Sequence, residues 1–493
     1  MIISTEIVKG HDTRGFASQV LCISYINKYG KVDFVNYSIP ESEYFKWEYA
    51  KGKTMPDPYF QSWDFKPVTR TKTKYISEYR IHEIMTDLTA SNPDIMNPLY
   101  EINSPDTYFC DIEVNVTDEG FPDAKHAKNE VNTISWVHGN EALVFGRALL
   151  TDQQIERMQE KLSEHCKGFE DHYIFKYIFY SSEVSMLSDF MYNYFAKADC
   201  ITGWNFFGYD YPYLFNRCNR LEIDLSPISP TGGFYNYKPY FSQANDRDAN
   251  ILLPTHRLLY DYMEVFAKWD RTVDPKENTK LDWVSEKVLG IKKVEHALGF
   301  KEFWEQKPDE YAMYNAVDSI LVREIDKKIH TANAMFALAS ITHVPVLHAF
   351  SSVRTLECVQ AEYLHRDGRV VPTDKQKAQK SEGYEGAYVY DPIPGAYKNV
   401  FALDFRSLYP TTEIMFNISP DTFKFKDRNH KIQADEIGTA SGAVYMRNKK
   451  GIIPVITQDF FNKRREYKKE MMIAEHEMYE LKEIYEKRFG KAI

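Results

Sequence analysis

The sequence predicts an α+β fold spread over several domains. Its 493 residues are enough for two to four domains with substantial cores. Short apolar runs such as Val20–Ile26 and Val32–Tyr37, separated by polar turns, indicate a mostly β region over residues 1–105, with one helix near His82–Leu88. Later segments carry apolar residues at helical spacing, most clearly along a basic helix that begins near Asp459.

The composition is that of an ordinary globular protein, with 43% hydrophobic and 27% charged residues. No apolar run approaches the roughly 20 residues that cross a bilayer, and the N-terminus has no features of an export signal. The six cysteines include no C-x-x-C pair, so we expect neither a disulfide framework nor a zinc site. The simplest location for such a chain is a reducing cytoplasm. The net charge of −10 does not exclude a nucleic-acid enzyme, because DNA needs only a basic channel.

Two carboxylates share one face of a predicted strand, Tyr108–Glu113. Side chains two residues apart on a strand point the same way, so Asp111 and Glu113 project together while Ile112 packs on the other side. Paired carboxylates repel each other unless a cation lies between them, and a divalent metal that prefers oxygen ligands is the natural partner. The alternative is an edge strand with a solvated acidic face.

Two later segments each present a further aspartate. In Ile201–Leu214, ITGWNFFGYDYPYL, Asp210 precedes a predicted helix and by itself is explained as a helix cap. In the predicted helix Tyr311–Val322, Tyr314 and Asp318 lie four residues apart on one face. For Asp318 the alternative is an exposed, solvated aspartate on the helix surface.

The segment Asn399–Asn417, NVFALDFRSLYPTTEIMFN, predicts a strand followed by a helix. The apolar run ends in Asp404, which would face a site at the end of the strand. Ser407 is a plausible helix cap, and Pro410 falls in the first helical turn, where a missing N–H costs little. A second strand is predicted at Gly451–Pro454, before the long basic helix.

That long helix carries Arg464 and Lys468 one turn apart, an arrangement that suits a triphosphate. The alternative is a solvated charged face. The helix also carries an apolar seam at alternating spacings of four and three, which predicts packing against a second helix. The seam residues are Tyr467, Met471, Ala474, Met478, Leu481 and Tyr485.

Four motifs, taken in order, resemble those of family B DNA polymerases. The motifs D-I-E, G-W-N-x-x-x-Y-D-x-P-Y and Y-x-x-x-D are similar to the three exonuclease motifs of that family, and D-F-R-S-L-Y-P is similar to its first polymerase motif. Thr411 stands where the family usually has Ser. The resemblance covers almost the whole chain and is to the N-terminal half of the T-even-like bacteriophage type. It implies a DNA-directed DNA polymerase with a proofreading 3′–5′ exonuclease, working in the cytoplasm of a phage-infected bacterium.

The resemblance also implies a role for each matching residue. In the exonuclease site, Tyr314 would orient the attacking water. The metal ligands would be Asp111, Glu113, Asp210 and Asp318 there and Asp404 in the polymerase site, with two Mg²⁺ or Mn²⁺ ions per site. The incoming nucleotide would contact Ser407, Leu408, Tyr409, Arg464 and Lys468, with Tyr409 as the sugar-selecting gate. DNA would contact Gly203, Asn205 and Phe206 at the unpaired 3′ end, where Phe206 or Phe207 could stack on a base, and Gly383, Tyr384 and Gly386 in the turn EGYEGAY.

The domains implied are a β-rich N-terminal domain over 1–105, completed by about 331–374, a ribonuclease H-like exonuclease domain over 106–330, a partial palm over 375–457 and the first fingers helix over 458–493. Between the second and third exonuclease motifs, Gly232–Pro254 predicts a hairpin insertion. In the phage type a hairpin at this place helps to separate the primer strand.

Nothing after Asp404 matches the D-x-D pair or the Lys-bearing helix that complete a family B polymerase site. We therefore expect a second polypeptide with the C-terminal polymerase half, a truncated chain being the alternative. The other expected partners are primer-template DNA, single-stranded 3′ ends, deoxynucleoside triphosphates and a sliding clamp, without a membrane. The other functions considered are a stand-alone exonuclease and a non-catalytic nucleic-acid-binding subunit.

Overall fold

The computed structural model describes most of the chain. The described residues are 1–11, 17–52, 54–74, 76–117, 120, 122–240, 250–270, 278–294, 297–372, 390–405 and 407–490. They form two compact units, each built from two separate stretches. The first unit comprises Met1–Glu41 and Leu88–Leu356, and the second comprises Ser42–Asp87 and Glu357–Ile493.

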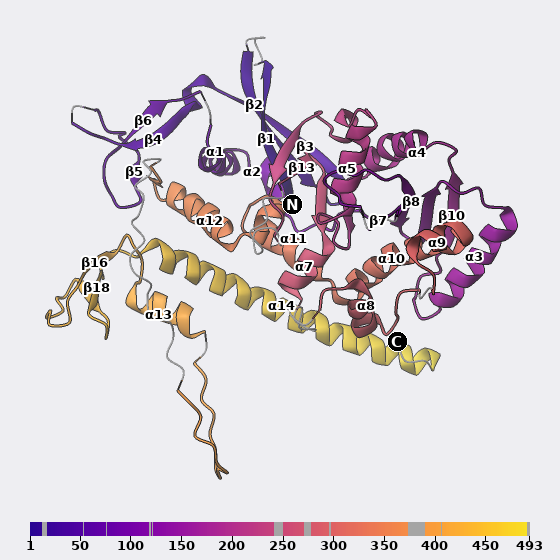
Figure 1. The fold of residues 1–493 in the computed structure, drawn as a ribbon. Coiled ribbons are helices and arrows are strands. Elements are labelled where there is room, and N and C mark those ends of the chain that lie inside the picture. The colour runs from indigo at the N-terminus through magenta and orange to yellow at the C-terminus, as the bar shows by residue number, and fades with distance from the viewer. Residues whose placement is uncertain are drawn as a thin grey trace. The chain divides into compact units, whose positions relative to one another are not determined.

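The first unit begins with a three-stranded antiparallel sheet in the order β1-β2-β3 (Figure 1). Its strands are β1 (Ile2–His11), β2 (Ala17–Ile26) and β3 (Val32–Ile39). Leu21 and Ile23 of the central strand are fully buried. The strands expected at Val20–Ile26 and Val32–Tyr37 are therefore confirmed.

A six-stranded mixed sheet forms the centre of the first unit. In order across the sheet its strands are β10 (Ile174–Phe179), β9 (Glu141–Gly146), β8 (Val131–His138), β7 (Thr107–Val114), β11 (Cys200–Gly203) and β14 (Leu258–Asp261). Strand β8 is antiparallel to both of its neighbours, and the remaining pairs are parallel. Almost every side chain of β8 is buried, as expected for a strand covered on both faces.

Helices cover this sheet, and α10 packs across β7 and β8. The helices of the first unit are α2 (Pro93–Met96), α3 (Asp152–His165), α4 (Glu183–Asp189), α5 (Asp210–Arg220), α7 (Tyr262–Trp269), α8 (Leu281–Leu289), α9 (Phe300–Gln306), α10 (Pro308–Ile329) and α11 (Thr331–Ile341). A π-helical turn, Phe190–Tyr194, continues α4. Short 3₁₀ turns lie at Asn97–Tyr100, Phe195–Lys197, Ser226–Ile228 and Val346–Phe350. Among the described helices, none is both long enough and apolar enough to cross a bilayer.

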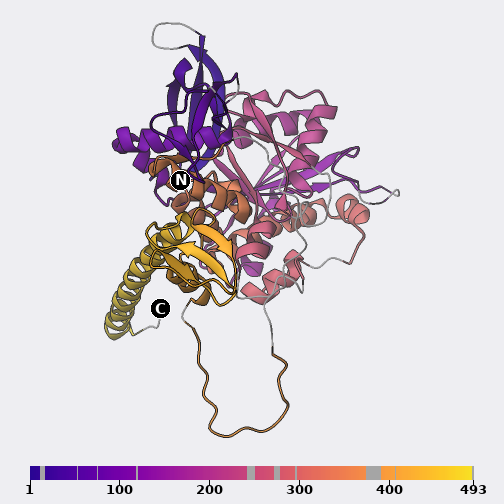
Figure 2. The same cartoon turned by 90° about the vertical axis from the view of Figure 1, so that its left-hand side faces the viewer.

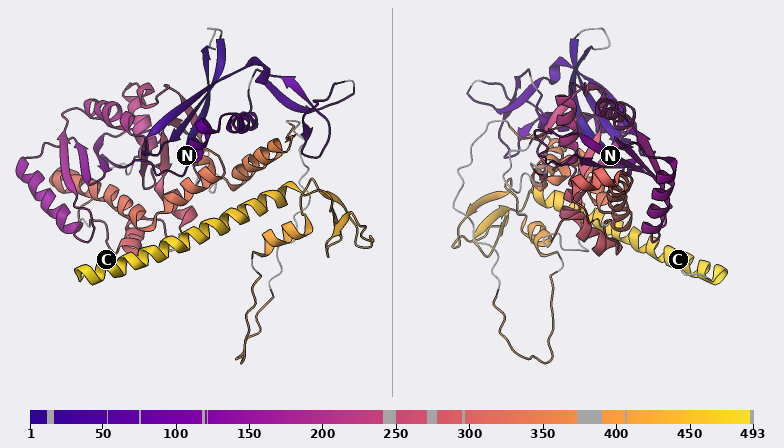
Figure 3. Two further views of the ribbon diagram at one scale, coloured as in Figure 1. Left: turned by 180° about the vertical axis from the view of Figure 1, so that it is seen from behind. Right: turned by 45° about the vertical axis from the view of Figure 1, so that its right-hand side comes forward.

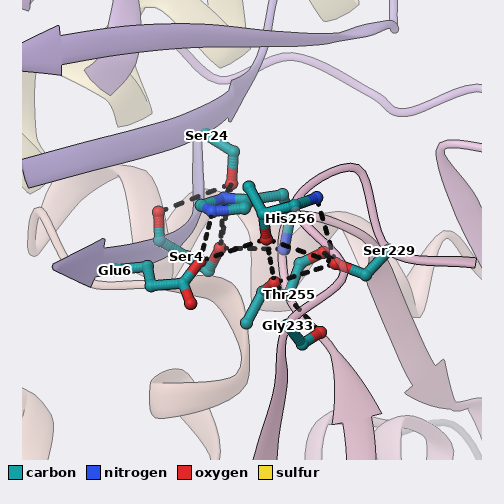
Figure 4. A network of polar contacts seen from close by, with 8 residues as sticks. Ser4, Glu6, Ser24, Ser229, Gly233, Thr255 and His256 are labelled. Carbon is teal, nitrogen blue, oxygen red and sulfur yellow. Dashed lines mark hydrogen bonds and ion pairs between the residues drawn. The ribbon is translucent and has the colours of Figure 1, made fainter. Parts of the chain in front are cut away.

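The hairpin expected within Gly232–Pro254 is present as the antiparallel pair β12 (Phe234–Tyr237) and β13 (Ile251–Pro254); residues 241–249 between them lie outside the described residues. At its base, a polar network joins the turn after β13 to the first sheet (Figure 4). The fully buried His256 contacts Glu6 Oε2 through Nε2 at 2.8 Å and Ser24 Oγ through Nδ1 at 3.0 Å. His256 has a φ of 59°, which is unusual for a residue with a side chain.

The second unit combines small sheets with long helices. It contains the strand pairs β4 (Phe45–Tyr49) with β6 (Val68–Lys72) and β5 (Gln61–Ser62) with β15 (Arg369–Val370), and the sheet β16 (Phe423–Lys426), β18 (Ala443–Met446) and β17 (Glu436–Gly438). Its helices are α13 (Leu408–Phe416), α14 (Ile452–Phe489), most of α12 (Ser352–Arg366) and the start of α1 (Glu78–Ser91), besides a short 3₁₀ turn at Glu41–Glu43. One core cluster holds Phe45, Trp47, Val68 and Val370.

The predicted strand at Gly451–Pro454 is wrong, because α14 already begins at Ile452 and runs without a break to Phe489 (Figure 3). Side chains from another part of the unit satisfy its first N–H groups. Gly451 N–H donates to Asn417 Oδ1 at 2.8 Å, Ile452 N–H to Asp421 Oδ1 at 3.2 Å and Ile453 N–H to Ser419 Oγ at 3.3 Å. Pro454 has no N–H to satisfy, so the helix start is complete.

The predicted strand at Asn399–Phe405 is also wrong. These residues form an exposed, irregular segment before α13 (Figure 2). A strand forms only where a neighbouring strand pairs with its backbone, and no described strand pairs with this segment. Ser407 takes the position before α13 but makes no capping bond with its side chain, whereas Pro410 does fall in the first turn.

The two units cut across the expected domain of residues 1–105, since Met1–Glu41 belongs to the first unit and Ser42–Asp87 to the second. The turn with Gly383, Tyr384 and Gly386 lies outside the described residues. All six cysteines are buried and unpaired, in agreement with the absence of a disulfide framework.

Candidate active site

Strand β7 and helix α10 bring three predicted carboxylates together in the first unit. Asp111 and Glu113 project from β7, and Asp318 projects from the middle of α10. One ligand oxygen from each lies within 4.8 Å of the other two. Among the described residues, no other group of acidic, histidine or cysteine side chains meets this criterion for a metal site. Asp404 therefore belongs to no such group within the described part of the chain.

Asp210 lies at the edge of this cluster as the first residue of α5. It is 4% exposed, and its Oδ1 accepts a hydrogen bond from the backbone N–H of Ile112 at 3.0 Å. The carboxylate thus reaches across to β7, between the two acidic residues of that strand. Burial, together with the nearby charge of Asp111, raises the pKa of Asp210 well above its ordinary value.

Three side chains surround the carboxylates. Lys293 Nζ lies 2.5 Å from Asp318 Oδ2 and donates to the hydroxyl of Tyr314 at 3.2 Å. Asn315, next to Tyr314 on α10, donates through Nδ2 to Asp111 Oδ2 at 2.7 Å. The predicted Tyr314 is therefore held over the cluster, and Asp111 is fixed in orientation.

Burial and mutual repulsion shape the electrostatics of the cluster. Burial, with the charge of Asp318, raises the pKa of Asp111 to about 8, although Lys293 opposes this shift. Burial also raises the pKa of Glu113 and of Asp318. For Lys293, burial alone would lower the pKa, but Asp318, Tyr314 and Asp111 raise it overall. Without a further cation, the raised pKa values favour protonation of these carboxyl groups, because one ammonium group does not balance three carboxylates.

These residues fit a divalent cation. The oxygen donors are of the kind that Mg²⁺ and Mn²⁺ prefer, they converge from two rigid elements, and the buried Oδ1 of Asp318 has no hydrogen-bond partner. A buried carboxylate oxygen without a partner costs free energy that a bound cation would offset.

The loop Gly203–Tyr209 lies between β11 and α5, beside the cluster. A side chain at Gly203 would clash with the backbone carbonyl of Cys110, so the loop leaves the sheet in close contact with β7. Asn205 is exposed, with a φ of 59°. Phe206 is fully buried against Phe207 and Tyr211. Phe207 is also buried, so the stacking of a base on Phe206 or Phe207 stays a prediction that would need one of these rings to turn outward.

The predicted polymerase residues meet in the second unit. Asp404, Ser407, Arg464 and Lys468 line one cavity of about 200 Å³ together with Phe461 and Arg465. Leu408 and Tyr409, at the start of α13, are exposed. The basic residues come from α14, whose seam residues Tyr467, Met471, Met478, Leu481 and Tyr485 are also exposed.

The sequence did not point to Lys293, Asn315 or Arg465. Lys293 lies in an irregular segment after α8, where a lysine is usually solvated and shows no pattern. Asn315 adjoins the predicted Tyr314, so its position on that face of α10 is the one signal available for it. Arg465 belongs to a basic run in the sequence, and nothing in that run distinguished it as a residue of the site.

Two family models match the chain, and each covers some of the predicted site residues. The family described as "DNA polymerase family B, exonuclease domain" matches residues 62–269, which include Asp111, Glu113 and Asp210. The family described as "DNA polymerase family B" matches residues 342–489, which include Asp404, Arg464 and Lys468.

The chain is also similar to individual curated DNA polymerases. The chain is 26% identical over 430 residues to a DNA-directed DNA polymerase of Escherichia phage RB69, a match that covers 82% of this chain and 45% of the relative. It is 26% identical over 406 residues to the DNA-directed DNA polymerase of Enterobacteria phage T4, a match that covers 77% of this chain and 44% of the relative. It is 27% identical over 282 residues to DNA polymerase 1 of Pyrococcus abyssi, a match that covers 55% of this chain and 34% of the relative. The matched region is thus less than half the length of the phage relatives. With two family B domains in family order, the chain belongs to the family B DNA polymerases.

Proposed function

We propose that this chain removes nucleotides from single-stranded 3′ ends of DNA at the cluster of Asp111, Glu113 and Asp318. The observation that carries the proposal is the convergence of these three carboxylates within 4.8 Å on β7 and α10. Asp210 would be the fourth carboxylate. Bound there, two Mg²⁺ or Mn²⁺ ions would supply an activated water and charge stabilisation for the leaving 3′ oxygen.

The protein's own groups would then orient the reactants. The Tyr314 hydroxyl, held by Lys293, would orient the attacking water, and the Lys293 ammonium would offset part of the negative charge at the scissile phosphate. Asn315 keeps the Asp111 carboxylate turned toward the cluster. The exposed Asn205 and the backbone at Gly203 would contact the 3′-terminal nucleotides.

We also propose that the second unit supplies part of a nucleotide-adding site. Asp404 lines one cavity with Arg464 and Lys468, so a metal-binding carboxylate and two phosphate-binding cations meet there. Tyr409 would contact the nucleotide sugar. The remaining carboxylate, and the second fingers helix, would come from polypeptide outside these 493 residues, which we propose is a second chain. A sliding clamp would be a further partner.

Primer degradation and primer extension, measured side by side, test both proposals. The chain by itself should shorten a single-stranded primer with Mg²⁺ and extend nothing. The double variant Asp111→Ala/Glu113→Ala should lose degradation, whereas Asp404→Ala should keep it. With the other polymerase half added, Asp404→Ala should lose extension.

A matched control is Asp152→Asn in the first turn of α3, an exposed aspartate away from both sites. It should behave as wild type in both assays. Degradation that survives the double variant would refute the exonuclease site, and extension that survives Asp404→Ala would refute the role of that residue.

A further inference from the structure

Asp261 lies in the first unit beside the loop Gly203–Tyr209 and is not one of the clustered carboxylates. It is the last residue of β14, and in the parallel pairing of β11 with β14 it lies opposite Gly203. Both strands therefore end at the same edge of the sheet, where the loop begins. Asp261 is 1% exposed, so its carboxylate must find its partners within the protein.

The two oxygens of Asp261 serve two different elements. Oδ1 accepts from Met263 N–H at 2.9 Å and so caps the start of α7. Oδ2 accepts from Phe207 N–H at 3.0 Å, in the middle of the loop. A helix cap needs one oxygen only, so the second bond is not explained by the cap.

The bond to Phe207 fixes the part of the loop that faces solvent. Phe207 lies two residues after the exposed Asn205 and one before the exposed Gly208. Asn205 has a left-handed φ of 59°, and its side chain lies against Gly208, where a side chain would clash with it. The backbone N–H groups of Gly208 and Tyr209 donate to the Asn205 carbonyl within the loop, and the Oδ2 bond of Asp261 ties the centre of this turn to the end of β14.

Asp210, at the far end of the loop, has its own anchor through Ile112 N–H. A loss of the Asp261 bond should therefore disturb the DNA-facing residues more than the carboxylates. The two effects can be measured separately, because a disturbed loop lowers the affinity for substrate, whereas disturbed carboxylates lower the turnover rate.

We propose that Asp261 is a positioning residue of the exonuclease site: it holds the loop Gly203–Tyr209 in the conformation that binds the single-stranded 3′ end. This inference rests on the proposed exonuclease function. Asp261 does not touch the substrate, and its effect passes through the Phe207 backbone.

The test compares substitutions that keep the cap of α7 but lose the second oxygen. Asparagine and serine both cap helices well. Asp261→Asn keeps one acceptor for Met263 and turns an NH₂ group toward Phe207, and the side chain in Asp261→Ser is too short to reach Phe207. Asp261→Ala loses both bonds. As a control, Thr151→Ala removes the capping side chain of α3, which accepts from Gln154 N–H at 3.3 Å.

The measurements are thermal unfolding, KM and kcat on a single-stranded oligonucleotide with Mg²⁺, and the Kd for the same oligonucleotide in EDTA by fluorescence anisotropy. Asp261→Asn and Asp261→Ser should unfold near the wild-type temperature, with KM and Kd raised about fivefold, the value of one hydrogen bond, and kcat nearly unchanged. Both Thr151→Ala and Asp261→Ala should unfold at a lower temperature than wild type, and Thr151→Ala should keep the wild-type KM and Kd.

Wild-type KM and Kd in both Asp261→Asn and Asp261→Ser would overturn the inference, and so would equal increases in Thr151→Ala. Failure of both capping variants to fold, while Thr151→Ala folds, would also overturn it, because the side chain would then be needed by the whole unit. A wild-type chain that binds the oligonucleotide in EDTA but never degrades it would contradict the proposed function instead, and Kd would still report on the loop.

Discussion

The ammonium group of Lys293 is the main positive charge beside the carboxylate cluster. It lies 2.5 Å from Asp318 and contacts the Tyr314 hydroxyl, so it balances one charge of the cluster and orients a neighbour. A preorganised cation in a site largely shielded from water acts more strongly on a developing negative charge than it would in solution.

Lys293→Ala should therefore lower the rate of 3′-end degradation by about a hundredfold, the usual cost of one preorganised group in an active site. This rate is measured by single-turnover degradation of a single-stranded oligonucleotide. Lys292→Ala is the matched control, since Lys292 is half exposed and pairs with Glu286 at 3.6 Å. Equal effects of the two substitutions, or none from Lys293→Ala, would argue against this role.

Strand and helix periodicity were enough to predict which side chains of β7 and α10 share a face. On β7, Asp111 and Glu113 lie on the same face, as residues two apart on a strand do. On α10, Tyr314 and Asp318 lie one turn apart on the same face. Lys293 could not be predicted, because its segment has no periodicity and only the tertiary fold brings it to Asp318. The burial of Phe206 was equally unpredictable, since an aromatic side chain in a loop can turn inward when a partner such as Tyr211 is available.

The start of α14 depends on residues far away in the sequence. Asp421 accepts from Ile452 N–H and also pairs with the buried Arg369 at 2.6 Å. The strand-like composition of Gly451–Pro454 is overridden by this capping, which no local pattern reveals. The opposite happened at Asn399–Phe405, where a strand-like sequence has no described strand to pair with.

Asp421→Ala should destabilise the second unit by about 3 kcal/mol, because the buried Arg369 then keeps only the exposed Asp367 as an acidic partner and α14 loses its cap. Urea unfolding followed by circular dichroism measures the change. In contrast, Asp435→Ala, which breaks a 3.5 Å pair between the exposed Asp435 and Lys424, should cost less than about 1 kcal/mol. Similar losses in the two variants would contradict this account.

The turn that joins β13 to β14 should make the stability of the first unit depend on pH. Burial lowers the pKa of His256 from 6.5, although the hydrogen bond with Glu6 opposes this. The unfolded chain therefore takes up a proton at a higher pH than the folded chain, and stability present above pH 6.5 is lost as the pH falls.

His256→Asn, which tolerates the left-handed φ, should show a smaller drop in melting temperature than wild type between about pH 7.5 and about pH 5.5. His126→Asn, at an exposed histidine whose ring contacts the neighbouring Asp123, should show the wild-type drop. A wild-type drop in His256→Asn would remove this residue from the pH response.

In the part of the chain that the structure describes, three of the predicted metal ligands form one cluster, and Asp404 belongs to no such cluster. Less than half the length of the phage relatives is matched, and the α14 seam is exposed. The predicted order of exonuclease and polymerase segments agrees with the two family matches. The division into two units was not predictable, because it depends on long-range contacts of Ser42–Asp87 with the last third of the chain.

If the remaining polymerase half packs on the seam, Met471→Glu should prevent its association, as measured by size exclusion and by loss of primer extension. Met472→Glu is the matched control, since it places the same charge on an equally exposed neighbour that is off the seam. Association that survives Met471→Glu as well as it survives Met472→Glu would show that the partner binds elsewhere.

The most direct test of the carboxylate site is the Mn²⁺ dependence of 3′-nucleotide release from a single-stranded oligonucleotide by the chain alone. We predict saturable activation of the wild type, complete inhibition by EDTA, and no release by Glu113→Gln/Asp318→Asn at any Mn²⁺ concentration. Wild-type release by this double variant, or release by the wild type that EDTA leaves unchanged, would contradict the assignment of this cluster as the hydrolytic site.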